Sequence, residues 1–115
     1  MKKAYLTASA AFVFLLLFSC SKKDHSPGNA VCDGTPKNFT TDVNPLVQTY
    51  CNQAACHDNA SINGPGPLTN YTQVFNARGE IRGQVEAGLM PQNTTLTTAQ
   101  KNTIICWIDS GAPNN

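Results

Sequence analysis

The sequence predicts a small all-α domain, and three observations support that prediction. Apolar residues recur at helical spacing just before Cys51, and a helix-start signal of the form T-x-x-Q begins at Thr97. No stretch of useful length alternates apolar and polar residues as a half-buried strand would. The chain of 115 residues holds one small domain at most. We expect about three to four short helices in it.

The first residues have the pattern of a bacterial lipoprotein signal. Lys2 and Lys3 precede a nearly unbroken apolar run over 8–18, and the run ends in the letters LFSC. This run is too short to span a bilayer and has the shape of a secretory signal. We therefore expect residues 1–19 to be removed and Cys20 to carry acyl chains that hold the exported protein to a membrane. An ordinary signal peptide or a short membrane anchor is the alternative.

Residues 20–34 are predicted to be a flexible tether. The segment is polar, contains Pro27 and Gly34, and shows no apolar period. We interpret its His25 as an exposed linker histidine, because a metal ligand needs a fixed position. The folded domain is then expected to comprise residues 35–115.

The first helix of the domain is predicted to run up to Cys51. Thr40 and Thr41 are its candidate N-caps, and Pro45 falls early enough for its missing N–H to matter little. Its apolar stripe follows the spacing i, i+3, i+4, i+7 and comprises Val43, Leu46, Val47 and Tyr50. The helix would therefore bring Cys51 to its C-terminal end.

Two short helical pieces are expected in the middle of the domain. Residues 58–69 form a loop rich in Gly and Pro, after which Asn70 is the expected cap of a helix over 71–76. Ile81 and Val85 indicate a further helical piece that ends near residue 88.

The last helix has the clearest signals. Thr97 and Gln100 form a capping box, and Gly111 followed by Pro113 marks the end. Its predicted apolar face comprises Ile104, Trp107 and Ile108.

The stretch CNQAACH, residues 51–57, carries the chemistry of the chain. Two thiols followed at once by an imidazole is the arrangement that attaches haem covalently, the cysteines through thioethers and the histidine as an iron ligand. The common form is C-x-x-C-H, whereas four residues separate Cys51 from Cys56 here. Those four residues are small or polar, so the loop can bulge away from the ring while His57 keeps its place. The motif therefore predicts a haem site with an extended spacing.

Three other interpretations apply to the same residues. Cys51 and Cys56 have a spacing that a disulfide can bridge in an oxidising compartment. A zinc site would need four ligands, and adjacent Cys56 and His57 rarely serve one ion. A catalytic thiol would normally have its histidine distant in sequence. The haem interpretation is favoured because so short a helical domain has few apolar side chains for a core, and a buried haem would complete it.

The order of these features resembles the small class I c-type cytochromes. It is most similar to single-haem cytochrome c-like lipoproteins that carry a C-x-x-x-x-C-H site and end in WI-x-x-GAP-N-N, as residues 107–115 do. The resemblance covers residues 31–115. It implies one covalently attached haem c, with thioethers at Cys51 and Cys56, His57 as the proximal iron ligand and Met90 as the distal one.

Two further expectations concern the iron ligands. Met90 is the only methionine left after the signal is removed, and it lies in a loop between helices, stiffened by Pro91. The ring nitrogen of His57 that does not bind iron needs an acceptor. By resemblance, that acceptor is the backbone carbonyl of Pro65 or Pro67.

The cysteine count completes the picture. Five cysteines is an odd number for an exported protein. Lipid takes Cys20 and haem takes Cys51 and Cys56, which leaves Cys32 and Cys106. We expect these two to form a disulfide that ties the tether to the last helix.

The resulting prediction is a membrane-tethered monohaem c-type cytochrome that carries single electrons between redox protein partners. It would face the periplasm or sit at the outer membrane of a Gram-negative bacterium. After Lys2 and Lys3 are removed, six Lys and Arg remain against seven Asp and Glu, which argues against nucleic acid as a partner. No small-molecule substrate and no enzymatic activity are expected. The alternatives are a haem-free, disulfide-stapled lipoprotein that binds a partner, and a haem enzyme or sensor with an open iron position.

Overall fold

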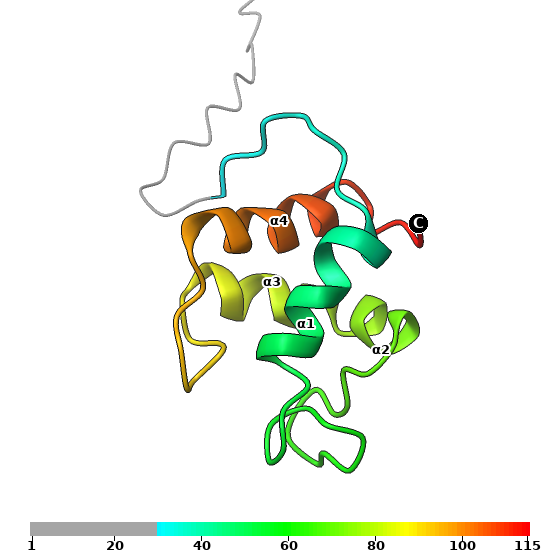
Figure 1. The fold of residues 1–115 in the computed structure, drawn as a ribbon, viewed down its shortest axis with the longest axis vertical. Helices are drawn as coiled ribbons and strands as arrows, with labels where there is room; N and C mark the ends of the chain where they lie inside the picture. The colour runs from blue at the N-terminus through cyan, green and yellow to red at the C-terminus, as the bar shows by residue number, and fades with distance from the viewer. Residues whose placement is uncertain (1–29) are drawn as a thin grey trace, which may run out of the picture.

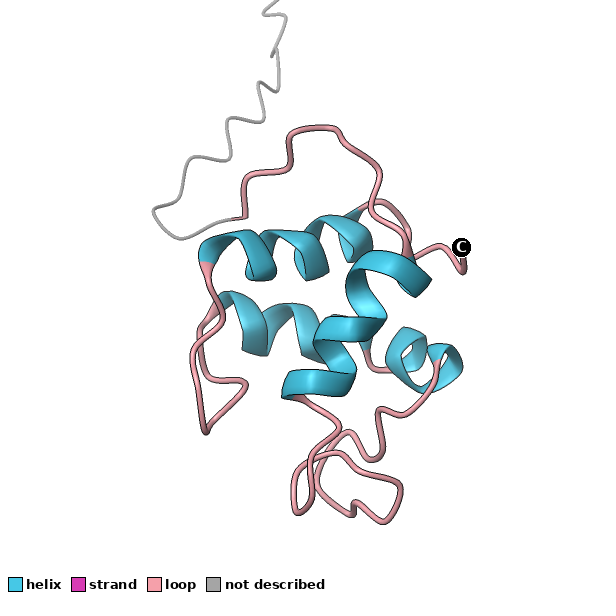
Figure 2. Ribbon diagram, in the orientation of Figure 1, coloured by secondary structure: helices cyan, strands magenta, loops and turns pink. Residues whose placement is uncertain are grey.

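The computed structural model describes residues 30–115. The predicted signal peptide, Cys20 and residues 20–29 of the predicted tether lie outside the described residues. The described part is helical and contains no strand, which confirms the all-α class (Figures 1 and 2). Its elements are the π-helical η1 (Phe39–Val43), α1 (Asn44–Tyr50), α2 (Tyr71–Asn76), α3 (Arg78–Glu86) and α4 (Thr98–Asp109). None of these helices is long and apolar enough to cross a membrane.

The core lies between α4, α3 and the continuous helix formed by η1 and α1. Figure 1 shows α3 alongside α4, with α1 crossing both and α2 at one end. Trp107 is fully buried, with its ring centroid 5.5 Å from that of Phe39. The Phe39 ring also meets Tyr71 edge-on at 5.1 Å, an arrangement that aromatic quadrupoles favour. The other fully buried large side chains are Val43, Val47, Val74, Val85, Ile104 and Ile105.

The start of the first helix differs from the prediction. Helical structure begins at Phe39, and neither Thr40 nor Thr41 serves as an N-cap. The C-terminal residue takes that role: the N–H of Phe39 donates to Oδ1 of Asn115, and the N–H of Thr40 donates to the Asn115 carbonyl, both at 2.9 Å. These bonds satisfy N–H groups that the first helical turn leaves without partners. The cap is therefore supplied by a residue distant in sequence.

The later helix signals are confirmed. Asn70 caps α2 by accepting from the N–H of Gln73. Thr97 and Gln100 form the reciprocal capping box of α4. Gly111, just beyond α4, has a φ of 103°, which lets the chain turn away from the helix axis.

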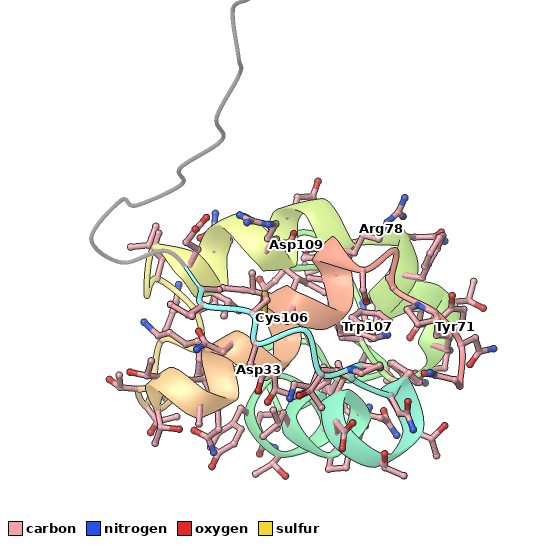
Figure 3. The ribbon with its side chains drawn as sticks, turned by 90° about the horizontal axis from the view of Figure 1, so that it is seen from above. Asp33, Tyr71, Arg78, Cys106, Trp107 and Asp109 are labelled. Carbon is pink, nitrogen blue, oxygen red and sulfur yellow. A yellow bond between two sulfur atoms is a disulfide. The ribbon has the colours of Figure 1, made fainter. Side chains whose placement is uncertain are left out.

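A disulfide joins Cys32 to Cys106, as the cysteine count predicts. The N-terminal strap, residues 30–38, runs across α4, and Figure 3 labels Cys106 where the strap crosses that helix. Cys106 is buried, whereas Cys32 is exposed. The cystine therefore fixes the strap to the outer side of the last helix.

Candidate functional site

One pocket collects all four of the predicted haem-binding residues. It has a volume of about 680 Å³ and is lined by Cys51, Cys56, His57 and Met90. Its apolar wall includes Leu68 from the loop after His57, together with Ile81 and Val85 from α3. Ligand pockets in proteins typically measure about 300–1,000 Å³. Residues far apart in the chain thus meet around a space of cofactor size.

His57 is held with one ring nitrogen toward the protein and the other available to the pocket. The side chain is 8% exposed, and its Nδ1 lies 2.9 Å from the backbone carbonyl oxygen of Gly66. A carbonyl only accepts, so Nδ1 carries a proton, and in the neutral form of the ring the lone pair is then on Nε2. No side-chain or backbone group among residues 30–115 bonds Nε2. This is the tautomer that a metal-binding histidine needs.

The acceptor of the His57 hydrogen bond corrects the sequence prediction. The bond goes to Gly66, and neither Pro65 nor Pro67 accepts it. Gly66 has a φ of 99°, a conformation that a residue with a side chain rarely adopts. The glycine between the two prolines allows the turn that places its carbonyl on the imidazole.

Cys51 and Cys56 both carry free thiols. The alternative disulfide between them is not formed. Burial, with a smaller contribution from the neighbouring Cys56, raises the pKa of the Cys51 thiol to about 11. A thiol with that pKa is almost entirely protonated at neutral pH, which disfavours a catalytic thiolate at this position.

Residues 30–115 contain no group of three or more His, Cys, Asp or Glu side chains placed to hold a metal ion. A structural zinc site needs four ligands. In the described part of the chain, the pocket is lined by two thiols, one imidazole and the Glu80 carboxylate, and no three of these side chains are grouped closely enough to hold one ion.

The four residues between the thiols are accommodated by hydrogen bonds in the thiol loop, residues 51–57. Gln53 closes the end of α1, because its Nε2 donates to the carbonyls of Thr49 (2.8 Å) and Gln48 (3.1 Å). The N–H of Cys56 donates to the Gln53 carbonyl at 2.9 Å, and the N–H of His57 donates to the Cys51 carbonyl at 3.2 Å. The extended spacing therefore folds into a compact turn that returns His57 to the end of the helix.

Met90 reaches the pocket from the loop that follows α3. It is half-buried, and the N–H groups of Leu89 and Met90 both donate to the Gln84 carbonyl, at 2.9 and 3.3 Å. Pro91 next to it is buried. These contacts fix the backbone that carries the thioether, as the sequence predicts for a loop methionine followed by proline.

The residues present fit a covalently attached haem. The pocket has two unpaired thiols, an imidazole with Nε2 free, and a thioether, all on one cavity with an apolar wall. Imidazole and thioether are the axial ligands of a six-coordinate c-type haem.

Gln53 and Asn63 are site residues that the sequence interpretation missed. Gln53 closes α1, and Asn63 lines the pocket and bonds the thiol loop. Side chains of this kind that bond loop backbone carry no periodic or spacing signal, which is why the sequence did not reveal them.

Comparison with protein-family models, with curated proteins and with solved structures found no match to this chain.

Proposed function

We propose that residues 35–115 form the haem domain of a small c-type cytochrome that carries single electrons. The observation that supports it is the pocket of about 680 Å³ on which Cys51, Cys56, His57 and Met90 converge. The motif alone places three of these residues within seven positions, whereas Met90 comes from a separate loop. That a second ligand type reaches the same cavity favours a haem site over an isolated thiol pair.

The roles of the side chains follow from their chemistry. Haem c supplies an iron that gains and loses one electron. His57 offers Nε2 to it, and the Gly66 carbonyl keeps the ring in the required tautomer. Met90 offers a soft sulfur, which favours the ferrous state. Cys51 and Cys56 would hold the haem covalently: each S–H would add across one vinyl group to give a thioether, with no oxidant or reductant consumed.

Covalent attachment is tested by intact mass. The full-length chain is expressed with a c-type maturation system, and we expect one haem mass that survives acid-acetone extraction. The double variant Cys51→Ser with Cys56→Ser should lose it. The double variant Cys32→Ala with Cys106→Ala lies away from the pocket and should keep it. A wild-type chain at the apo mass, with a disulfide between Cys51 and Cys56, would favour the haem-free binding protein instead.

Met90 separates an electron carrier from a haem enzyme or sensor. With sulfur on the iron, the reduced protein should bind carbon monoxide poorly, and Met90→Ala should bind it readily and show a lower reduction potential. Gln92→Ala, which changes another pocket residue of the same loop, is the control. Ready binding of carbon monoxide by the wild type would support the open-site alternative.

The chemistry of a redox partner is indicated by the charge around the pocket. Between residues 43 and 77 the only Asp, Glu, Lys or Arg is Asp58, and residues 87–100 have none. Among residues 30–115, Glu80 is the one Asp, Glu, Lys or Arg that lines the cavity. We therefore expect a redox protein with a nearly uncharged docking face and an encounter rate that changes little with salt. Nucleic acid does not fit such a surface.

Attachment to a membrane remains a proposal based on residues 1–20. The Cys32–Cys106 cystine supports export, because disulfides persist in oxidising compartments. Cys20→Ala should release the protein from the membrane fraction or leave it unprocessed, as acyl chains contribute about 0.8 kcal/mol per buried methylene. Wild-type protein recovered unacylated in the soluble fraction would contradict this.

A further inference from the structure

One asparagine connects the thiol loop to the turn formed by residues 63–66, which orients the His57 ring. Nδ2 of Asn63 donates to the backbone carbonyl of Ala55 at 3.0 Å and to that of Cys56 at 3.2 Å. The backbone carbonyl of Asn63 accepts from the N–H of Gly66, whose own carbonyl accepts from Nδ1 of His57. The hydrogen bonds thus run from Cys56 through Asn63 and Gly66 to His57, which is the chain neighbour of Cys56. The circuit is closed.

These hydrogen bonds hold the thiol loop at the residue where its backbone is strained. Ala55 has a φ of 63°, a left-handed conformation that is unfavourable for a residue with a Cβ. Such a conformation persists only when the surrounding structure holds it. Asn63 bonds the carbonyl of this residue directly.

The other hydrogen bonds of the loop do not replace this connection. Ser61 donates its hydroxyl to the Cys56 carbonyl and accepts from the N–H of Asn63, so it supports the same corner. It makes no bond to Gly66 or to Ala55 among the described residues. Among residues 30–115, Asn63 is the residue whose side chain bonds the thiol loop at both Ala55 and Cys56 and whose backbone carbonyl also holds the N–H of Gly66.

We propose that Asn63 is a positioning residue of the haem site, which keeps the Cys56 sulfur and the His57 ring in one fixed relation despite the extended spacing. This inference rests on the proposed function, because positioning is meaningful only if both side chains serve one haem. Thioether formation adds S–H across C=C and is redox-neutral, so the loop contributes through geometry. Asn63 acts through its neighbours and needs no contact with iron.

The test compares two asparagines of the same loop. Asn63→Asp keeps the side-chain shape but replaces the donor by an oxygen that faces two carbonyls. Asn59→Asp introduces the same charge at an exposed residue whose side chain makes no hydrogen bond within residues 30–115. The full-length protein is used in both cases, and the wild type is first shown by intact mass to carry haem.

Two measurements report on positioning. In the haem-free chain, the amide of Gly66 should exchange with solvent about tenfold faster in Asn63→Asp than in Asn59→Asp, since the Asn63 carbonyl that holds this amide is no longer tied to the thiol loop and the turn opens more often. In the haem-loaded chain, Asn63→Asp should carry less covalent haem and show a displaced reduction potential, because the imidazole is less firmly held. Asn59→Asp should match the wild type in both.

Each outcome decides the question. Equal amide exchange and equal potentials for the two variants would overturn the role of Asn63. If Asn63→Asp does not fold, as judged by far-UV circular dichroism, Asn63→Ala is measured in its place. Unfolding of both, with Asn59→Asp folded, would show a purely structural residue and also overturn the proposal. A wild-type chain without haem would contradict the proposed function instead, and the Gly66 exchange would still report whether the circuit exists.

Discussion

The two sides of this molecule are held together by different forces. On the side of η1 and α4, large apolar side chains surround the fully buried Trp107, and a cystine fastens the strap. On the pocket side, residues 51–67 contain a single buried residue, His57. There the chain is fixed by hydrogen bonds from Gln53 and Asn63 to backbone carbonyls.

The difference shows how a small domain can keep a cavity of about 680 Å³. Apolar packing removes space, because it brings side chains into contact. Side-chain to backbone hydrogen bonds fix the course of a loop without filling the volume beside it. A chain that concentrates its packing on one side is therefore free to keep a cavity on the other.

The largest expected loss of stability comes from a substitution in the apolar core between η1 and α4. Trp107→Ala removes the central side chain of the core, so we expect a loss of about 3–5 kcal/mol in the free energy of unfolding, measured with urea on the haem-free chain. Ile108→Ala, at a half-buried neighbour on the same helix, is the control and should lose less than half as much. Equal losses would mean that Trp107 is not the centre of the core.

Removal of the cystine should weaken the same side without disturbing the pocket. Cys32 and Cys106 are 74 positions apart, and the double variant Cys32→Ala with Cys106→Ala should lose about 2–4 kcal/mol of unfolding free energy. The amide exchange of Gly66 should stay at the wild-type rate under conditions in which both proteins remain folded. Faster exchange at that one amide would show that the two sides are coupled.

In the haem-free chain, the free energy of unfolding should depend on pH because the Cys51 thiol on the pocket side has a shifted pKa. Burial raises the pKa of this thiol from 9.0 in the unfolded chain to about 11 in the folded one. Because the folded-state pKa is the higher one, the stability that the protonated Cys51 thiol contributes is fully present below about pH 9. It is lost as the pH rises through about 11.

Alkylation kinetics measure the same shift. The folded chain should have about 100-fold less Cys51 thiolate than the unfolded chain near neutral pH, and iodoacetamide should react correspondingly slowly. A urea-unfolded sample is the control. Equal rates for Cys51 in both states would rule out the buried thiol.

The smallest effect concerns the end of α1. Gln53→Ala removes two hydrogen bonds to carbonyls at the helix end and should cost about 1 kcal/mol of unfolding free energy. Thr49→Ala, an exposed residue whose side chain makes no hydrogen bond among residues 30–115, should have little effect. A Gln53→Ala variant as stable as wild type would mean that water replaces the amide fully.

Features with short-range causes could be predicted from the sequence. Asn70 and Thr97 cap their helices through residues three positions away, so the signal lies within one turn. The first helix start was wrong because its cap is Asn115, and nothing in a linear pattern marks so distant an acceptor.

The site could be predicted to a similar degree. The Cys51, Cys56 and His57 motif and Met90 were identified by chemistry, and the structure brings all four to one pocket. The acceptor of His57 was predicted one residue away from Gly66, because the choice depends on which carbonyl the turn directs inward. The haem itself stays a prediction.

The Asn63–Gly64 dipeptide is also a site where the asparagine can deamidate. Glycine leaves the following backbone nitrogen open to attack the asparagine amide, and no atom lies within 4 Å of the position that a Cβ of Gly64 would occupy. The attack closes a cyclic imide and releases ammonia, after which water opens the ring to aspartate or isoaspartate. While Nδ2 of Asn63 is bonded to the carbonyls of Ala55 and Cys56, the amide is held and this ageing is slowed. Stored protein in which the thiol loop has lost its order should therefore deamidate first at this dipeptide, which peptide mapping of old and fresh preparations will show.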